Sequence, residues 1–410
     1  MLNLNNEREL AYVVTIDEIE PIEGADRVEV AVVGGWRVMV RKGQFKVGDP
    51  AIYFEIDSKV PETDAFEFLA SKHYKIKTQK YFKGTVISQG LLMAAEDLGW
   101  TAESPLVGVP YIVDDENKPH IPENKHNMFL TQKLGVTYAV SEDNVRKGKG
   151  ADKYQKMAQR MGKKFSKQPY RWLMKHTFGK KLLYVFYGKK KDGRGWPVWV
   201  KKTDEERIEN LPFMFKDKSP FVATEKIDGT STTFSLYKKR FGYDYYVCSR
   251  NVVFTEDKQD NCYYDTNVYL EMSKKYFVEE VLQRMLTEQF PKAKWITIQG
   301  ETYGDGIQKK DYDMKNGQHD FMAFNLVVDG YGRFGTIEMK EILSNYGIPT
   351  VPIIDDNYIL PDNIDELRAF VNSEPSKVDG KIKEGIVFRS LDGQKSFKCV
   401  SPEFLLKYHS

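Results

Sequence analysis

Short hydrophobic runs with polar breaks fill the first hundred residues. β-Branched and aromatic residues dominate these runs, and Gly-Gly, Lys-Gly and Gly-Asp pairs interrupt them, as expected of short strands joined by tight turns. One short helix is expected over Asp64–Lys72. Several short strands with a single helix predict a small β-barrel of the OB type that binds nucleic acid. The strand-forming runs span residues 9–22, 27–43, 48–57 and 75–93.

From about residue 198 the pattern changes to strands mixed with helix, so the expected fold class is α+β. We expect one helix over residues 276–289. Prolines near residues 103–125 mark a boundary, which divides the chain into parts 1–105, 106–197 and 198–410. The middle part is expected to be partly helical over residues 151–165. The strands of the last part are expected at 221–227, 232–237, 295–303, 320–328 and 385–390.

The near-neutral net charge of +2 hides an uneven distribution. Residues 144–202 contain 19 Lys and Arg but only two acids, a balance of +17, which leaves −15 for the rest of the chain. Aromatic residues interleave with this charge. Lysines release counterions from phosphates, and aromatic faces stack on bases, so the segment indicates nucleic-acid binding. The alternative is a solvated helical hairpin whose aromatic side chains pack inward. The candidate nucleic-acid contacts in it are Lys163, Lys164, Arg171, Lys180 and Lys181.

Composition excludes several classes of protein. Hydrophobic residues make up 41% of the 410, enough for buried cores, and three cysteines are too few for a disulfide framework or a zinc site. No apolar run is long enough to cross a bilayer. The polar opening differs from a secretory signal. We therefore expect a cytoplasmic protein with no membrane partner.

The chemistry centres on a lysine at the end of a predicted strand. Lys226 follows the run FVATE and precedes an Asp-Gly turn, which places an amine at the mouth of whatever pocket the strands form. A lysine nucleophile must lose its proton, so its pKa must fall well below ~10.4, which burial and nearby cations can cause. A four-residue motif of this kind also occurs by chance, as an exposed lysine before a hairpin.

Six motifs in order make the chain resemble the covalent nucleotidyltransferases, which include DNA ligases, RNA ligases and mRNA capping enzymes. The successive gaps between their key residues are 24, 51, 23, 60 and 14 residues. The resemblance implies a C-terminal domain of antiparallel sheets with helices. The motifs are EKIDG at 225–229, CSRN at 248–251, QGETYG at 299–304, FMAFNL at 321–326, KEGIVFR at 383–389 and SFKCVSPEF at 396–404.

The same resemblance assigns roles to these residues. Lys226 attacks the α-phosphate of ATP, with Lys398 and Arg250 as the other catalytic cations and Arg250 also near the RNA end. Glu384 serves the catalytic Mg²⁺ or Mn²⁺, since Mg²⁺ prefers oxygen ligands shared with phosphate. The residues implied in nucleotide binding are Glu225, Ile227, Asp228, Gly229, Glu301 beside the ribose, Phe324 stacked on the purine, and Lys398. Gly229 is expected to keep the turn tight.

The order of the domains indicates which group within the superfamily the chain resembles. Only 12 residues follow Lys398, so we do not expect the OB domain that DNA ligases and capping enzymes carry there. The predicted OB domain comes first, and residues 19–61 and 202–212 resemble the Deinococcus-type RNA ligases, the fifth RNA ligase family. Two departures stand out: Val400 replaces the second lysine of the last motif, for which Lys395 or Lys407 could compensate, and the middle part is long.

The leading hypothesis is an ATP-dependent RNA ligase that joins 3′-OH and 5′-phosphate RNA ends, at nicks in duplexes, as a monomer. Its intermediates would be a lysyl-AMP and an adenylylated RNA end. Two alternatives stay open. One keeps the fold but acts on DNA nicks or caps 5′ ends. The other is a non-catalytic RNA-binding protein, in which RNA binding is salt-sensitive and no ATP is consumed.

Overall fold

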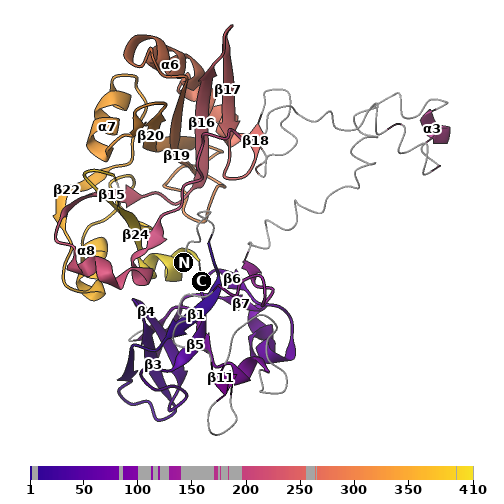
Figure 1. Ribbon diagram of the computed structural model, residues 1–410, viewed down its shortest axis with the longest axis vertical. Helices are drawn as coiled ribbons and strands as arrows, with labels where there is room; N and C mark the ends of the chain where they lie inside the picture. Colours follow the sequence, from indigo (N-terminus) through magenta and orange to yellow (C-terminus); the bar gives the residue numbers. More distant parts are fainter. Residues whose placement is uncertain are drawn as a thin grey trace.

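The computed structural model shows two β-rich domains that meet where both ends of the chain lie (Figure 1). It describes residues 1, 8–82, 86–99, 112–113, 119–120, 129–139, 170–173, 176, 183, 196–254, 264, 266–393 and 395–409. Within these residues no helix is both long and apolar enough to cross a membrane.

Three three-stranded antiparallel sheets lie in the N-terminal domain: β1-β5-β10, β2-β3-β4 and the shorter β13-β6-β7. β5 is hydrophobic throughout because successive side chains point to opposite faces and both faces are buried. Ile52 and Phe54 enter one core, and Ala51 and Tyr53 enter another. The strands are β1 Ala11–Thr15, β2 Glu18–Pro21, β3 Val28–Val33, β4 Trp36–Arg41, β5 Pro50–Phe54 and β10 Leu91–Met93.

Smaller elements complete this part of the chain. The expected helix is present as η1, a 3-10 helix over Asp64–Lys72, and it ends at His73, whose φ of 53° reverses the chain. The described strands match the expected OB-type runs but do not link into one closed ring. The short elements are β6 Ser58–Lys59, β7 Lys75–Ile76, β8 Gln79–Tyr81, β9 Val86–Ser88, η3 Glu96–Leu98, β11 Ile112–Val113, β12 Pro119–His120, β13 Thr137–Tyr138 and α3 Tyr170–Leu173.

The C-terminal domain contains two larger sheets. A five-stranded sheet has the order β14-β24-β23-β15-β22, and a six-stranded sheet has the order β18-β17-β16-β19-β20-β21. β15 and β16 are neighbours in sequence but lie in different sheets, so three residues, 227–229, cross between the sheets. The strands are β14 Glu206–Arg207, β15 Pro220–Lys226, β16 Thr230–Lys238, β17 Tyr243–Cys248, β18 Val253–Phe254, β19 Trp295–Gly304, β20 His319–Val328, β21 Gly332–Arg333, β22 Ile353–Ile359, β23 Gly385–Ser390 and β24 Ser396–Val400.

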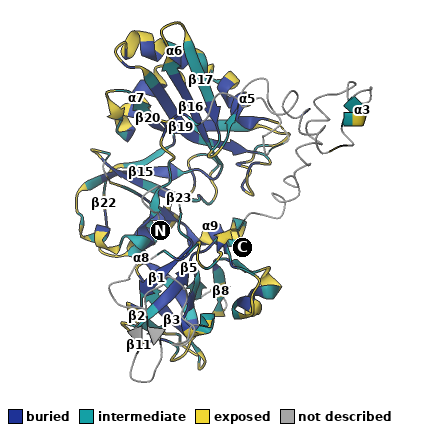
Figure 2. Cartoon of the chain, turned by 45° about the vertical axis from the view of Figure 1, so that its right-hand side comes forward, coloured by how far each residue is buried: buried dark blue, intermediate teal, exposed yellow. Residues whose placement is uncertain are grey.

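Helices cover one face of each large sheet. Those on the six-stranded sheet bury their apolar residues against its strands and leave exposed residues on their outer sides (Figure 2). α8 packs similarly on the five-stranded sheet. The helices are α5 Val268–Lys275, α6 Val278–Arg284, the π-helical turn η9 Met285–Gln289, α7 Thr336–Ser344, α8 Ile364–Ser373, α9 Pro402–Tyr408, and the 3-10 turns η6 Ile208–Asn210 and η7 Pro212–Lys216.

The α+β class and the five predicted strands of the C-terminal domain are confirmed. The expected helix at 276–289 differs in detail, because Phe277 has a φ of 48° that separates α5 from α6. α5, which precedes it, was not predicted. The helix expected at 151–165 lies outside the described residues.

Polar contacts and shared hydrophobic packing join the two domains. Asn210 Oδ1 accepts hydrogen bonds from Trp36 Nε1 at 2.7 Å and from the Tyr12 hydroxyl at 3.0 Å. Val400 and Leu405, near the C-terminus, are buried in a core otherwise made by the N-terminal domain. The N-terminal domain is therefore fixed beside the end of β24, where the predicted site lies.

Candidate active site

Strand pairing brings the predicted nucleophile to its acidic partner. β15 pairs with β23 in antiparallel register, and Lys226 lies opposite Gly385. Glu384, one residue earlier, therefore lies beside Lys226, although 158 residues separate the two in sequence. Lys226 Nζ donates to Glu384 Oε2 at 2.6 Å. The Lys226 side chain is 24% exposed, so it is partly open to solvent.

Two further carboxyl groups face the same amine. Glu301 is placed by the pairing of β19 with β16, and Asp228 lies on the crossing segment. Burial, with repulsion from Glu384, raises the pKa of each to about 8. Burial lowers the pKa of Lys226, but Glu384 and Glu301 outweigh it, so that pKa is raised. The depressed pKa expected from sequence is thus wrong for the protein without a bound cation, because acids outnumber cations around Lys226.

Position 229 requires glycine because β19 lies too close for a side chain, and not because the backbone there adopts a left-handed conformation. Its φ is not positive, but an added Cβ would lie 2.3 Å from the Thr302 carbonyl oxygen. Ile227 is buried in a hydrophobic cluster. Glu225 is also buried and is held by Ser376 Oγ and, at 2.7 Å, by the Lys377 amide. These three predicted nucleotide-binding residues therefore support the backbone around Lys226 through protein contacts.

A buried group that the sequence did not indicate holds the crossing segment. The Asp228 amide donates to the Tyr312 hydroxyl at 2.7 Å. Lys310 Nζ lies 4.2 Å from the centre of the Tyr312 ring, 3.2 Å from Asp379 Oδ2 and 2.8 Å from the Ile382 carbonyl oxygen. Lys310 and Asp379 are each 1% exposed. Lys310 lies in the loop between β19 and β20, Asp379 lies in the loop between α8 and β23, and none of the predicted motifs includes either residue.

A single carboxylate holds both of the other predicted catalytic cations. Asp204 Oδ1 accepts from Lys398 Nζ at 2.6 Å, and Asp204 Oδ2 accepts from Arg250 Nη2 at 3.1 Å. Burial opposes ionisation of Asp204, but the two cations lower its pKa well below the usual range. Asp204 lies in a stretch that resembled the ligase family, yet nothing in the sequence singled it out.

The predicted base-stacking residue lies in a second ionic cluster. Phe324 is half-buried on β20, with the Arg389 guanidinium 5.7 Å from the centre of its ring. Arg389 also donates to the Phe324 carbonyl at 2.7 Å and to Glu205 at 2.9 Å. Phe324 is thus held in place from the five-stranded sheet, with its ring at the edge of the cluster that contains Ile227.

The departure at Val400 has a structural explanation. Val400 is 2% exposed and packs in the core shared with the N-terminal domain. Lys395 does not replace the missing lysine, because its amine pairs with Asp217 at 2.5 Å. Lys407 lies 5.0 Å from the Tyr408 ring. The second position of this motif therefore contributes to domain packing.

Arg207, adjacent to Lys398 in the β14–β24 pair, is a further cation that was not predicted. It is 5% exposed, lies over the Trp36 ring at 5.5 Å, and its Nε and Nη1 have no hydrogen-bond partner among the described residues. Burial of such donors is costly unless something pairs with them. Arg207 Nη2 lies 3.8 Å from Asp57 Oδ2, so Arg207 adds a buried guanidinium beside Lys398 on the side of the N-terminal domain.

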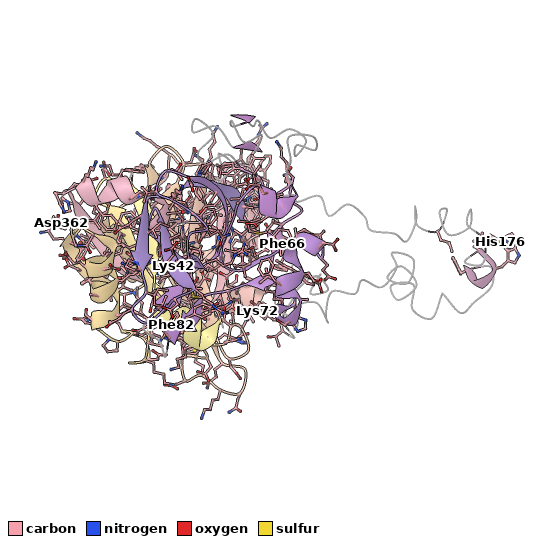
Figure 3. The ribbon with its side chains drawn as sticks, turned by 90° about the horizontal axis from the view of Figure 1, so that it is seen from below. Lys42, Phe66, Lys72, Phe82, His176 and Asp362 are labelled. Carbon is pink, nitrogen blue, oxygen red and sulfur yellow. The ribbon has the colours of Figure 1, made fainter. Side chains whose placement is uncertain are left out.

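The basic residues predicted from the middle of the chain cannot be placed at the site. Lys163, Lys164, Lys180 and Lys181 lie outside the described residues. Arg171 is part of α3, which lies, with His176, away from both domains (Figures 1 and 3).

The acids present suit a divalent cation that substrate helps to hold. Within the described ranges no three His, Cys, Asp or Glu side chains converge as a preformed metal site. Glu384 nevertheless stands at a cluster of carboxyl groups, two of which bind protons up to about pH 8. Mg²⁺ commonly binds through one or two carboxylates plus phosphate oxygens, so the donor set fits a cation that arrives with a nucleotide.

Comparisons with known proteins agree with this geometry. Residues 219–409 match the RNA ligase family model, and residues 10–95 match the model of an OB-fold domain. No curated protein sequence matches the chain. The solved Naegleria gruberi RNA ligase with PPi is 25% identical, with a TM-score of 0.69 over 98% of this chain and 99% of that one.

A structure of the same ligase with AMP and Mn, carrying a glutamate-to-alanine substitution, is 25% identical with a TM-score of 0.68 over 98% and 99% of the two chains. The likeness covers both domains in one chain. Residues 219–409 are therefore an RNA ligase domain, and the chain as a whole has the fold of an RNA ligase with an N-terminal OB-fold domain.

Proposed function

We propose that this RNA ligase is ATP-dependent and forms a covalent lysyl-AMP on Lys226. The observation that carries the proposal is the Lys226 amine at the end of β15 in the RNA ligase domain, 2.6 Å from Glu384 Oε2. Lys398 and Arg250, gathered on Asp204, supply positive charge for phosphate. Phosphoryl transfer depends on positioning and charge neutralisation, which this arrangement of residues provides.

In the first step Lys226 loses its proton, for which the hydrogen-bonded Glu384 carboxylate is a direct acceptor. The neutral amine attacks the α-phosphorus of ATP and forms an N–P bond. The bond between that phosphorus and the oxygen bridging to the β-phosphate breaks, and pyrophosphate leaves with the electron pair. Lys398 and Arg250 neutralise the α-phosphate, Glu301 contacts the ribose, and Phe324 contacts the adenine.

Glu384 would hold the divalent cation, which would supply positive charge and so lower the pKa of the Lys226 amine. The residues of the chain then provide orientation: Tyr312 fixes Asp228, and the close approach of Gly229 to β19 fixes the start of β16. We assign metal binding to Glu384. Glu225, Ile227, Asp228 and Gly229 are assigned to shaping the nucleotide site.

In the second and third steps AMP passes from Lys226 to an RNA 5′-phosphate, and a 3′-OH displaces AMP to form the phosphodiester. We propose nicks in duplex RNA as the substrate, with the OB-fold domain and the middle part of the chain, 106–197, as RNA contacts. Lys163, Lys164, Arg171, Lys180 and Lys181 are the residues assigned there. We further propose a Deinococcus-type RNA ligase that acts in the cytoplasm as a monomer.

The Naegleria ligase supports the assignment of residues. Its solved structures include substitutions of a lysine and an aspartate two residues apart, and of a glutamate and a lysine fourteen residues apart. Those residue types and separations match Lys226 with Asp228 and Glu384 with Lys398. That ligase has also been solved with ATP and Mn.

The test is covalent labelling with α-labelled ATP and Mg²⁺, followed by a denaturing gel. Label on the wild-type chain that is lost in Lys226→Ala and kept in the exposed control Lys216→Ala would establish the lysyl-AMP. Label that persists in Lys226→Ala would overturn the assignment. An unlabelled wild type, folded and free of bound AMP, would favour a non-catalytic RNA-binding protein.

The acceptor is tested separately with nicked duplexes. Each carries a 5′-phosphate at the nick, and the strand that ends in 3′-OH is either RNA or DNA. Sealing that requires the RNA strand supports an RNA ligase acting at nicks. Equal sealing of both would show a polynucleotide ligase without sugar selectivity.

A further inference from the structure

Asp204 is held at both ends by different sheets. Before it, the Lys201 carbonyl accepts from Gln299 Nε2 on the six-stranded sheet at 2.9 Å. After it, β14 pairs in parallel with β24 of the five-stranded sheet. Its neighbour Glu205 pairs with Arg389 on β23. The backbone around Asp204 therefore forms a second crossing between the sheets, beside the one that carries Asp228.

The two cations that Asp204 binds also come from different sheets. Lys398 projects from β24, and Arg250 follows β17 in the six-stranded sheet. Both contacts are short, 2.6 Å and 3.1 Å, and the Asp204 side chain is only 13% exposed. Two cations brought toward one phosphate repel each other, and a carboxylate between them offsets that repulsion. Each contact uses one of several N–H donors, three on lysine and five on arginine.

We propose that Asp204 is a positioning residue of the ligase reaction, which aims Lys398 and Arg250 at one phosphate by linking the two sheets that carry them. This inference rests on the proposed function. Asp204 itself carries negative charge and does not bind the phosphate. Asp204 acts by orienting Lys398 and Arg250, so it should stabilise the transition state for transfer of AMP more than it strengthens the binding of ATP.

A second consequence concerns the charge of Lys398. Burial lowers the pKa of Lys398, and the charges around it are Asp204, Arg207 on β14, Lys226 on β15 and Arg8 of the N-terminal domain. Of these only Asp204 favours the protonated amine. Replacement of Asp204 by a neutral residue therefore lowers the pKa of Lys398 further and removes its charge at a lower pH.

The test compares single-turnover adenylation by wild type and Asp204→Asn across ATP concentrations and pH. The expected maximal rate is lower by about ten- to a hundredfold, because small displacements of catalytic groups have effects of this size. The expected KM for ATP changes less than the rate, and the alkaline loss of rate moves to lower pH. Asp204→Glu, which keeps the charge, should restore part of the rate. Asp217→Asn, which breaks the exposed pair with Lys395, is the matched control.

Different outcomes separate the two proposals. If the wild type is labelled and Asp204→Asn has the same adenylation rate and pH profile as the wild type, this inference is overturned. The proposed function would then remain intact. A lower KM with an unchanged rate would make Asp204 a competitor of phosphate and would also overturn it. A wild type that does not label refutes the proposed function itself.

A thermal melt checks that each variant folds. If Asp204→Asn fails that check, Arg250→Gln and the double variant Asp204→Glu/Arg250→Gln replace it. If Asp204 acts through Arg250, the Asp204→Glu change costs less in the Arg250→Gln background than in wild type. Full additivity would contradict the inference.

Discussion

Of the lysine–carboxylate pairs in the C-terminal domain, Lys226–Glu384 and Lys310–Asp379 differ sharply in burial, and this difference separates their roles. Lys226 and Glu384 are 2.6 Å apart and are 24% and 13% exposed. Lys310 and Asp379 are 3.2 Å apart and each 1% exposed. The same kind of ion pair is therefore partly open to solvent at Lys226 and fully buried at Lys310. We call these the reachable pair and the sealed pair. The sealed pair supports Tyr312, which binds the backbone beside Lys226, so one pair holds the loop on which the other depends.

The largest effect is expected from breaking the sealed pair. Lys310→Met leaves the Asp379 carboxylate buried without its partner, which costs about 3–5 kcal/mol of the free energy of unfolding. The melting temperature should fall by about 10 °C. The double variant Lys310→Met/Asp379→Leu should recover much of that loss, because no lone charge remains. An unchanged melting temperature in the single variant would show that the pair is not sealed.

Breaking the reachable pair should affect chemistry and spare the fold. Glu384→Gln removes the carboxylate proposed as proton acceptor and metal ligand, so adenylation of Lys226 should slow by about a hundredfold or more. Glu403→Gln, on the exposed side of α9, serves as control. Single-turnover labelling measures the rate, and a thermal melt measures stability. Adenylation at the wild-type rate would contradict the role given to Glu384.

The pH dependence of stability should report the acids around Lys226. A carboxyl whose folded pKa is raised to about 8 stabilises the fold below its unfolded pKa near ~4, and this contribution is lost progressively as the pH rises toward 8. Glu301→Gln should therefore flatten the loss of melting temperature between about pH 5 and 8 in metal-free buffer. Glu338→Gln on α7 should leave the slope unchanged. A steeper slope in Glu301→Gln would reverse the inferred direction.

The smallest effect is expected at Tyr312, which contacts Lys310 of the sealed pair and binds the backbone beside Lys226 of the reachable pair. Tyr312→Phe keeps the ring that packs on Tyr303 and Lys310 but removes the hydroxyl that the Asp228 amide binds. An unpaired buried amide costs about 1 kcal/mol or more, which corresponds to about a fivefold loss in the adenylation rate if it is felt at Lys226. Tyr331→Phe, half-exposed on the surface, is the control. A loss in stability without a loss in rate would separate the two pairs.

Sequence patterns predicted what depends on neighbours along the chain. The strands β15, β16, β19, β20 and β23 follow from alternating and continuous apolar runs. The position of Lys226 at a strand end follows from the Asp-Gly turn after it. The contacts of Asp204 and Tyr312 could not be predicted, because each joins residues tens to hundreds of positions apart whose register only the folded sheets determine.

The raised pKa of Lys226 and the burial of Val400 have the same origin. Both depend on which strands become neighbours and on how the domains pack, and residue types in a motif do not encode either. Compared with the motif alone, Val400 suggests that a phosphate-binding lysine has been lost. In the structure its side chain contributes to the packing between the two domains.

The burial of Val400 and Leu405 within the N-terminal core also has a consequence for synthesis of the chain. Domains generally fold as they emerge from the ribosome, N-terminal first. Here the N-terminal domain completes its core only after Val400 and Leu405 have been made, and Lys226 can meet Glu384 only slightly earlier, once residue 384 has been made. A chain that ends before residue 384 therefore lacks both a finished N-terminal core and the contact between Lys226 and Glu384, so we expect such truncated chains to be prone to degradation.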